Sequence, residues 1–322
     1  MAFLSRDIYK SFFRSKSMKA FFLFIFSLLL VFLQADLIIS EYGSNRIFRF
    51  NESAGEFSNF ITQGSGTMSG PGTPVYGADG NLYVVSWSNG KILKYDGQTG
   101  AFLSTVVTQS ANTIWSMALG ADNQFYGGIW STSGSVYRYN SSGIYVDTFI
   151  SASSGGLSYP SGLQFGPDGK LYVASYGNNT ILRYNGTTGQ YIDTFVSPGV
   201  SFKEFDLGLD GNIYVGLSNG SVNKYNGTTG AFTSTFAQGM GTIYDVEFSH
   251  DGNILYVNDT NYLYKYNAQT GQLLNTYAFP TGTLSPWYMT FMPSTVIVPE
   301  ISSLVMLSSL LVCLFLRKKI YH

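Results

Sequence analysis

Four carboxylates occupy alternating positions of two short segments, a spacing that suits cation chemistry. One apolar residue separates Glu204 from Asp206, and one separates Asp245 from Glu247. Side chains two residues apart point to the same face of a β-strand, so each pair lies on one face. Four carboxylates at close range repel one another unless water, protons or a cation intervenes. The spacing therefore predicts either a Ca²⁺-type site, since Ca²⁺ prefers several oxygen ligands, or a hydrated acidic wall.

A second candidate site consists of aromatic residues that each leave a predicted strand. They are Tyr42, Trp87, Trp130 and Tyr176, each followed by glycine or serine. Aromatic rings beside short polar residues suit the apolar faces and the hydroxyl groups of sugars. We expect these rings to be exposed on one rim, together with the loops that enter the innermost strands. In the alternative interpretation the rings only cover strand edges.

Several classes of site lack the residues that they need. The sequence has two histidines, His250 and His322, and no Ser-His-Asp set or glycine-rich phosphate loop, which argues against a histidine-based lyase or a zinc site. The only cysteine is Cys313, so the chain has no internal disulfide. Residues 36–300 contain 18 acidic and 10 basic residues, a net charge of −8, which makes a nucleic-acid partner unexpected.

The elements that position these residues follow from a repeat. In each repeat unit an aromatic residue stands at the end of a predicted strand. These residues are Phe50, Tyr95, Tyr139, Tyr184, Tyr225 and Tyr266, and they are separated by 45, 44, 45, 41 and 41 residues. Short alternating strands with a period of 40–50 residues are typical of a β-propeller. The unit period therefore predicts an all-β fold with four-stranded antiparallel blades.

The two ends of the repeat predict how the ring closes. The first unit, from Asp36, lacks its innermost strand, and residues 285–293 read as an innermost strand with nothing after it. Joining them gives six blades, one of which combines one C-terminal strand with three N-terminal strands and leaves no free edge. Asp-Gly pairs such as Asp168-Gly169 predict two-residue hairpin turns with positive backbone torsions. The carboxylate pairs then lie on adjacent innermost strands beside the axial channel.

The unit PSGLQFGPDGKLYVASYGNNTILRYN at residues 160–185 resembles the NHL repeat. The resemblance extends in degenerate form over residues 36–293, and Ser86 and Ser175 stand where the family usually has aspartate. The resemblance implies a six-bladed propeller that serves as a binding platform. Some relatives of NHL propellers are metal-dependent lactonases or lyases.

The N-terminus is predicted to be a signal peptide. Five basic residues precede a run of 14 apolar residues, AFFLFIFSLLLVFL, which ends at Gln34-Ala35. A charged region followed by a short apolar region and a small residue is typical of secretory signal peptides, here residues 1–35. Met18 followed by Lys19 also begins a well-proportioned signal, so Met18 is a candidate start. Export is the expected consequence.

The C-terminus is predicted to carry a sorting signal. Residues 294–300 form a linker with Pro299 and Glu300, and residues 301–322 contain a 16-residue apolar run followed by the basic cluster Arg317, Lys318 and Lys319. This pattern resembles the PEP-CTERM signal, although Ile301 replaces the second proline. The resemblance implies processing by an exosortase, at least transient contact with the membrane, and the surface or extracellular matrix of a Gram-negative bacterium. An ordinary tail anchor is the alternative. The propeller is thus flanked by two expected hydrophobic helices.

Two functions remain open from the sequence. The first is a secreted or surface-sorted, non-enzymatic binding or scaffold propeller that contacts exopolysaccharide or another envelope component. The second is a Ca²⁺-dependent lactonase or lyase of the gluconolactonase or streptogramin-lyase type. Such a site would need further ligands from other blades, for which the sequence offers the neutral residues Asn112, Gln164 and Thr290. The lack of histidines favours the first function.

Overall fold

The structure is a computed structural model that describes residues 35–109, 113–283 and 285–293. The described residues belong to one compact unit, Ala35–Pro293. The predicted signal peptide, the linker, the sorting segment and Asn112 lie outside the described residues. Within the described residues, no helix is long and apolar enough to cross a membrane.

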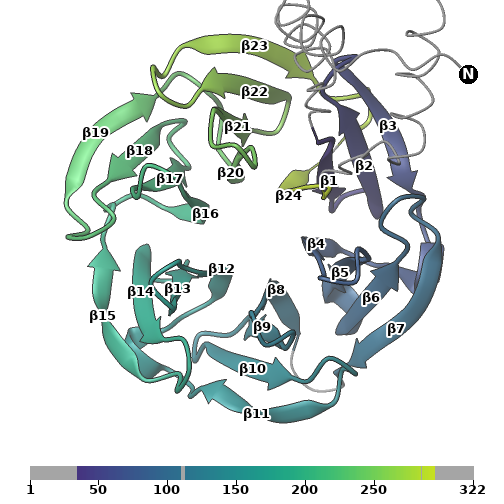
Figure 1. Ribbon diagram of the computed structural model, residues 1–322, viewed down its shortest axis with the longest axis vertical. Helices are drawn as coiled ribbons and strands as arrows, with labels where there is room; N and C mark the ends of the chain where they lie inside the picture. The colour runs from purple at the N-terminus through teal and green to yellow at the C-terminus, as the bar shows by residue number, and fades with distance from the viewer. Residues whose placement is uncertain (1–34, 110–112, 284, 294–322) are drawn as a thin grey trace, which may run out of the picture. The chain divides into compact units, whose positions relative to one another are not determined.

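The chain forms six four-stranded antiparallel sheets arranged around a central axis, as predicted (Figure 1). The first sheet contains β24 (Pro286–Phe291), β1 (Leu37–Glu41), β2 (Arg46–Asn51) and β3 (Glu56–Ile61). The next two contain β4 (Pro71–Tyr76), β5 (Leu82–Ser86), β6 (Lys91–Tyr95) and β7 (Phe102–Thr108), then β8 (Ile114–Leu119), β9 (Phe125–Ile129), β10 (Ser135–Tyr139) and β11 (Tyr145–Ile150).

The remaining three blades follow the same order from the axis outward. They contain β12 (Pro160–Phe165), β13 (Lys170–Ser175), β14 (Thr180–Asn185) and β15 (Tyr191–Val196); β16 (Phe202–Leu207), β17 (Ile213–Leu217), β18 (Val222–Tyr225) and β19 (Phe232–Ala237); β20 (Asp245–Phe248), β21 (Ile254–Asn258), β22 (Tyr262–Asn267) and β23 (Leu273–Ala278). Three short 3₁₀ helices connect strands: η1 (Ser65–Thr67), η2 (Trp87–Asn89) and η3 (Ser154–Gly156).

The ring closes as the sequence predicts. The C-terminal strand β24 pairs antiparallel with β1, with Phe291 opposite Leu37 and Met289 opposite Ile39. This pairing completes the first blade from one C-terminal and three N-terminal strands. Because β1 then has partners on both sides, its inner edge is no longer open to pairing with another chain.

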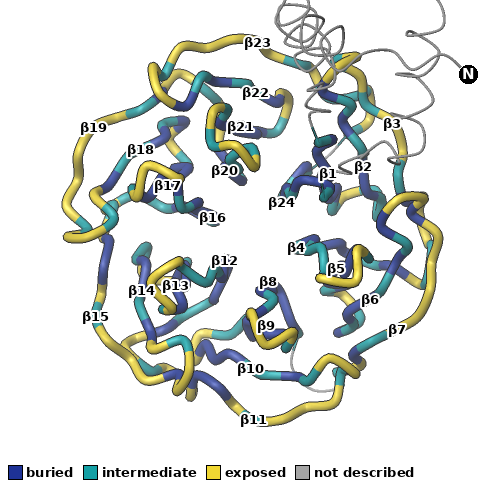
Figure 2. Tube along the Cα trace, viewed as in Figure 1, coloured by how far each residue is buried: buried dark blue, intermediate teal, exposed yellow. Residues whose placement is uncertain are grey.

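The core lies between neighbouring blades. The repeat-marking aromatics are buried there; Tyr95, Tyr139 and Tyr184 are each at most 1% exposed. The hydroxyl groups of Tyr95 and Tyr184 donate to backbone carbonyls at η1 and η3, so burial leaves them paired. Burial is greatest in the inner three strands of each blade, and the outermost strands carry most of the exposed residues (Figure 2).

The Asp-Gly turns differ from the predicted two-residue type. The backbone N–H of Gly166 donates to the carbonyl of Lys170 (2.9 Å), so three residues, Pro167 to Gly169, form the loop. Only Gly169 has a positive φ, +74°. The Asp168 carboxylate instead accepts from the N–H of Lys170 (3.1 Å) and from the hydroxyl of Tyr172 (3.1 Å). The expected turn type was wrong because a type I turn with a glycine bulge also uses Asp-Gly.

Ser86 and Ser175, the last residues of β5 and β13, hold the segments that precede the innermost strands. The hydroxyl of Ser86 accepts from the N–H of Ser69 (2.9 Å) and donates to its carbonyl (3.2 Å). Ser175 makes the same two contacts with Ser158. Each serine thereby fixes the segment that leads into the innermost strand of its own blade, so these positions are structural.

Candidate functional site

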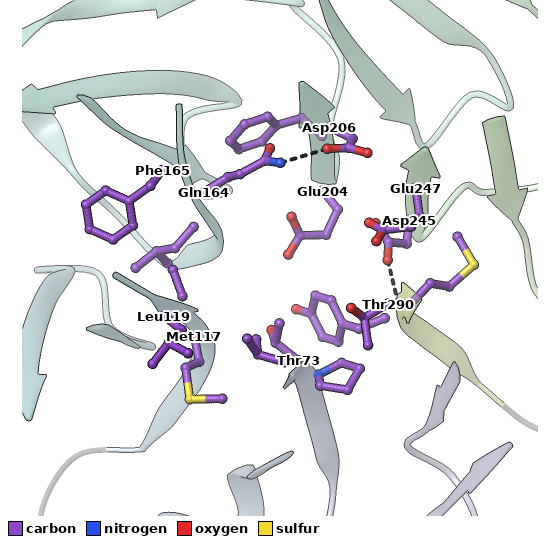
Figure 3. A pocket seen from close by; sticks show the side chains of 17 residues that line it. Thr73, Met117, Leu119, Gln164, Phe165, Glu204, Asp206, Asp245, Glu247 and Thr290 are labelled. Atoms are coloured by element: carbon purple, nitrogen blue, oxygen red, sulfur yellow. Dashed lines mark hydrogen bonds between the residues drawn. The ribbon is translucent and has the colours of Figure 1, made fainter. Parts of the chain in front are cut away.

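The four predicted carboxylates line one cavity of about 260 Å³ on the axis (Figure 3). Glu204 and Asp206 come from β16, and Asp245 and Glu247 come from the adjacent innermost strand β20. Strict alternation along these strands brings both pairs to the cavity, as predicted. The rest of the lining comes from the other four innermost strands and from Phe205 of β16, and it includes Thr73, Met117, Leu119, Gln164, Phe165 and Thr290.

Two of the four carboxylates are held by backbone amides. Asp206 accepts hydrogen bonds from the N–H of Phe248 (2.7 Å) and from the side-chain amide of Gln164 (2.8 Å). Asp245 accepts from the N–H of Met289 on β24 (2.6 Å). These bonds fix Asp206 and Asp245 against neighbouring innermost strands. The carboxyl groups of Glu204 and Glu247 face the cavity (Figure 3).

Burial changes the charge state of the cluster. Burial raises the pKa of Asp206 to about 6. Burial, reinforced by the neighbouring carboxylates, raises the pKa of Glu204 and of Glu247 well above the usual range. The pKa of Asp245 is raised in the same way, first by burial. Protons therefore neutralise part of the repulsion that the sequence predicts, because a buried carboxyl group favours its uncharged form.

The fit of this cavity to a metal ion is incomplete. Among the described residues, no group of three or more His, Cys, Asp or Glu side chains converges closely enough to hold a metal ion. Gln164 and Thr290, the described neutral residues considered as further ligands, both line the cavity. The Gln164 amide oxygen and the Thr73 hydroxyl have no hydrogen-bond partner among the described residues. The Ca²⁺ site remains a prediction.

Tyr288 on β24 crosses the channel beside the cavity. Its buried hydroxyl donates to the carbonyl of Ser161 on β12 (3.2 Å), and β12 lies opposite β24 in the ring (Figure 1). Burial, followed by Glu204, raises the pKa of Tyr288 well above its usual value. Beside it, a Cβ at Gly162 would overlap the Glu204 carboxyl group, so this glycine provides the space for that side chain. Tyr288 and Gly162 were not predicted from the sequence.

The predicted aromatic residues belong to one cluster of contacting rings. The loops that carry them meet the segments entering the innermost strands, as predicted: the N–H of Trp87 donates to Gly70 (2.9 Å) and that of Trp130 donates to Thr113 (3.1 Å). We call the whole group the aromatic mouth. It consists of Tyr42, Trp87, Trp115, Trp130, Tyr159, Tyr176, Tyr244 and Trp287.

Trp115 on β8 is the centre of the aromatic mouth. Its ring stacks on Trp130 with centroids 4.3 Å apart and lies 5.0 Å from the rings of Trp87 and of Trp287. Trp287 stacks in turn on Tyr42 at 4.2 Å. In the ring only β4 lies between β8 and β24, so the contact between Trp115 and Trp287 joins two blades that are not neighbours (Figure 1). Both rings lie near the starts of their innermost strands, so the aromatic mouth lies at one end of the channel.

The expectation that the rim rings are exposed was wrong. Tyr42, Trp87, Trp130 and Tyr176 are all of intermediate exposure, because they pack on one another and on Trp115. Their rings remain open to solvent in part.

The two-residue alternation of strands did not predict Trp115 and Trp287 as site residues, because both lie at β-bulges. In β8, Ile114 and Ser116 pair with consecutive residues of β9, so Trp115 is an extra residue. The register of β24 shifts in the same way between Pro286 and Met289. A bulge redirects the side chain of the extra residue, which here turns toward the axis.

Comparison with known proteins identifies the fold only. No family model and no curated protein sequence matches this chain. A chain of a nidogen/laminin complex is similar with a TM-score of 0.68 and 14% identity, covering 81% of this chain and 99% of that chain. A Bacteroides caccae protein of unknown function has a TM-score of 0.61 and 10% identity, covering 81% and 99%.

A gluconolactonase from Xanthomonas campestris is also similar, with a TM-score of 0.56 and 18% identity, covering 69% of this chain and 78% of that chain. One of these neighbours belongs to a protein complex and another is an enzyme, so the likeness does not choose between binding and catalysis. By its fold, this chain is a six-bladed β-propeller similar to those of the nidogen/laminin complex and of gluconolactonase.

Proposed function

We propose that this protein is an exported, non-enzymatic binding propeller whose aromatic mouth contacts polysaccharide or another envelope component. One observation carries the proposal: five of the six blades contribute rings to one partly exposed surface at the end of the channel. Soluble proteins rarely leave a contiguous apolar surface of this kind without a partner. Partly exposed tryptophan and tyrosine rings can stack on the apolar face of a sugar.

The predicted export and sorting signals agree with this proposal. A signal peptide at residues 1–35 and a sorting signal at residues 299–319 would deliver the propeller to the cell surface or extracellular matrix, where polysaccharide is abundant. An exosortase-type enzyme would process the tail, and residues 301–316 would contact the membrane at least transiently. The amino-acid sequence is the only support for export, processing and membrane contact.

Affinity electrophoresis against exopolysaccharide extracted from the source organism tests the proposal. We expect the double variant Trp87→Ala and Trp130→Ala to be retained several-fold less than the wild type, because two stacking surfaces are lost. The matched control is Tyr145→Ala with Phe232→Ala, which removes two rings that are 49% and 57% exposed on outermost strands. Circular dichroism below the melting temperature of each variant confirms that the folded proteins are compared.

The outcome is decided by comparison of the two double variants. Because Trp87 and Trp130 are partly buried, their replacement also lowers the melting temperature by more than the control does. Equal retention of the wild type and the mouth variant, both folded, would contradict the proposal.

A lactonase or lyase remains the second candidate, and the acidic cavity is the observation that favours it. Four carboxyl groups, Gln164 and Thr290 line one cavity on the axis (Figure 3). Calorimetric titration with Ca²⁺ and a screen of lactone hydrolysis with and without Ca²⁺ test this function. Heat of binding together with Ca²⁺-dependent turnover would place catalysis ahead of binding.

A further inference from the structure

A lysine without an ionic partner lies in the aromatic mouth. Lys203 belongs to β16, the innermost strand of the one blade that contributes no ring to the mouth. Its Nζ lies 4.2 Å from the ring centroid of Trp287 and 4.7 Å from that of Tyr244. At these distances a cation is attracted by the negative faces of the rings. The register of β16 shifts between Phe202 and Phe205, so Lys203 lies in the same kind of bulge as Trp115.

Lys203 is exceptional among the basic residues of the described chain. Eight of the ten described lysines and arginines form ion pairs with carboxylates, and Lys91 donates to the hydroxyl of Thr67 (3.0 Å). Within the described residues, Lys203 has ring contacts and no ion pair. An unpaired, partly buried ammonium group is costly, since it loses water without gaining an anion.

The surroundings of Lys203 leave its charge available. It is faced by Tyr244 from the segment before β20 and by Trp287 from β24, and the nearest acids along β16 and β20 are Glu204 and Asp245. Both acids turn into the cavity, where burial raises their pKa. Burial also lowers the pKa of Lys203 to about 8, which leaves it mostly protonated at neutral pH.

We propose that Lys203 binds the anionic group of the ligand, and that the aromatic mouth takes an acidic polysaccharide whose sugar rings carry carboxylates. This inference rests on the proposed function and adds the chemical class of the ligand. A uronate unit presents an apolar ring face and a carboxylate attached to the same ring. The mouth presents the complementary pair, ring faces beside an ammonium group that lacks an anion.

The acidic charge of the domain does not oppose this assignment at the mouth. At physiological ionic strength, charges more than about 8 Å apart are largely screened, so the local ammonium group dominates. The surrounding acidic surface instead repels a polyanion elsewhere, which restricts binding to the mouth.

Affinity electrophoresis on a matched pair of polymers tests the inference. One gel contains polygalacturonate, and the other contains the same polymer with its carboxyl groups reduced to alcohols. At pH 7 we expect Lys203→Met to bind polygalacturonate roughly tenfold more weakly than the wild type, as for the loss of a charge-assisted hydrogen bond. Retention on the reduced polymer is unchanged. Lys91→Met removes the same charge outside the mouth and leaves both retentions within about twofold.

The pH dependence gives a second readout. Only the ammonium form of Lys203 pairs with a carboxylate, so retention of the wild type on polygalacturonate falls as pH rises through about 8. Binding stabilises the charged form, and the midpoint therefore lies at or above that value. Lys203→Arg keeps the charge to much higher pH and abolishes this fall, while Lys203→Met is retained weakly at every pH.

The outcomes separate the inference from the proposed function. Equal retention of the wild type on both polymers, or of Lys203→Met and the wild type on polygalacturonate, overturns the inference and leaves polysaccharide binding intact. No retention of the wild type on either polymer or on extracted exopolysaccharide overturns both. If Lys203→Met does not fold, Lys203→Arg decides, since a pH-dependent fall identical to that of the wild type contradicts the role of Lys203.

Discussion

The aromatic mouth and the acidic cavity share the innermost strands β8, β16 and β24, yet they differ in chemistry. The mouth presents aromatic rings and the unpaired Lys203, whereas four carboxyl groups line the cavity. The four carboxylates alternate along β16 and β20, and Glu204 shares the register shift of β16 with Lys203. Trp115 and Trp287 lie at register shifts of β8 and β24. An extra residue in a strand thus turns neighbouring side chains toward two different surfaces.

The largest expected effect concerns the charge of the acidic cavity. The folded pKa of Asp206, about 6, exceeds its unfolded value of 3.8, so the folded state binds more protons between these values and stability falls as pH rises through them. Asp206 alone accounts for roughly 3 kcal/mol of this loss. Glu204, Asp245 and Glu247 act in the same direction.

Urea unfolding between pH 5 and pH 8 measures the part of this loss that occurs above pH 5, about half of it for Asp206. The variant Glu247→Gln removes one charge and should reduce the slope while raising the stability at pH 8 relative to the wild type. The turn aspartates do not obscure the effect: hydrogen bonds to Asp168 lower its pKa against the effect of burial, so it titrates below this window. A free energy of unfolding that is constant or rises between pH 5 and pH 7 would contradict the prediction, because it would mean that other groups offset the effect of the four carboxyl groups.

The next largest expected effect comes from removing Trp115, the central ring of the aromatic mouth. Trp115 is 6% exposed and contacts three other tryptophan rings. We expect Trp115→Ala to lower the free energy of unfolding by about 3–5 kcal/mol, as for other large-to-small changes at buried aromatic positions. Phe232→Ala, at a 57% exposed ring on β19, is the control and should cost less than about 1 kcal/mol. Similar losses in chemical denaturation for both variants would mean that the mouth contributes no more than an exposed ring.

The smallest expected effect concerns the space for Glu204. A Cβ at Gly162 overlaps the Glu204 carboxyl group, so Gly162→Ala should cost about 1–3 kcal/mol. In the background of Glu204→Ala the same change should cost much less, because the obstructing group is gone. A double-mutant cycle measures this coupling energy. Additive effects of the two substitutions would place the Glu204 side chain elsewhere and reopen the arrangement of the cavity.

Much of the fold was predictable from local patterns. The spacing of Phe50, Tyr95 and their equivalents predicts the blade number, and the missing strand at Asp36 together with the extra one at Ser285 predicts the closure. The turn type at Asp168-Gly169 was not predictable, because two turn classes share that dipeptide. The exposure of Trp87 and Trp130 was also misjudged, since it depends on Trp115 from another strand.

The sequence by itself determined the six blades, their closure and the shared cavity of Glu204, Asp206, Asp245 and Glu247, because two-residue alternation and a regular repeat are local properties of the chain. Only the tertiary structure decided that Trp287 contacts both Trp115 and Lys203, that Tyr288 reaches β12, and that burial raises the carboxyl pKa values. These features arise from bulges and from contacts between blades far apart in sequence. Their energies depend on how six strands converge, which no single repeat encodes.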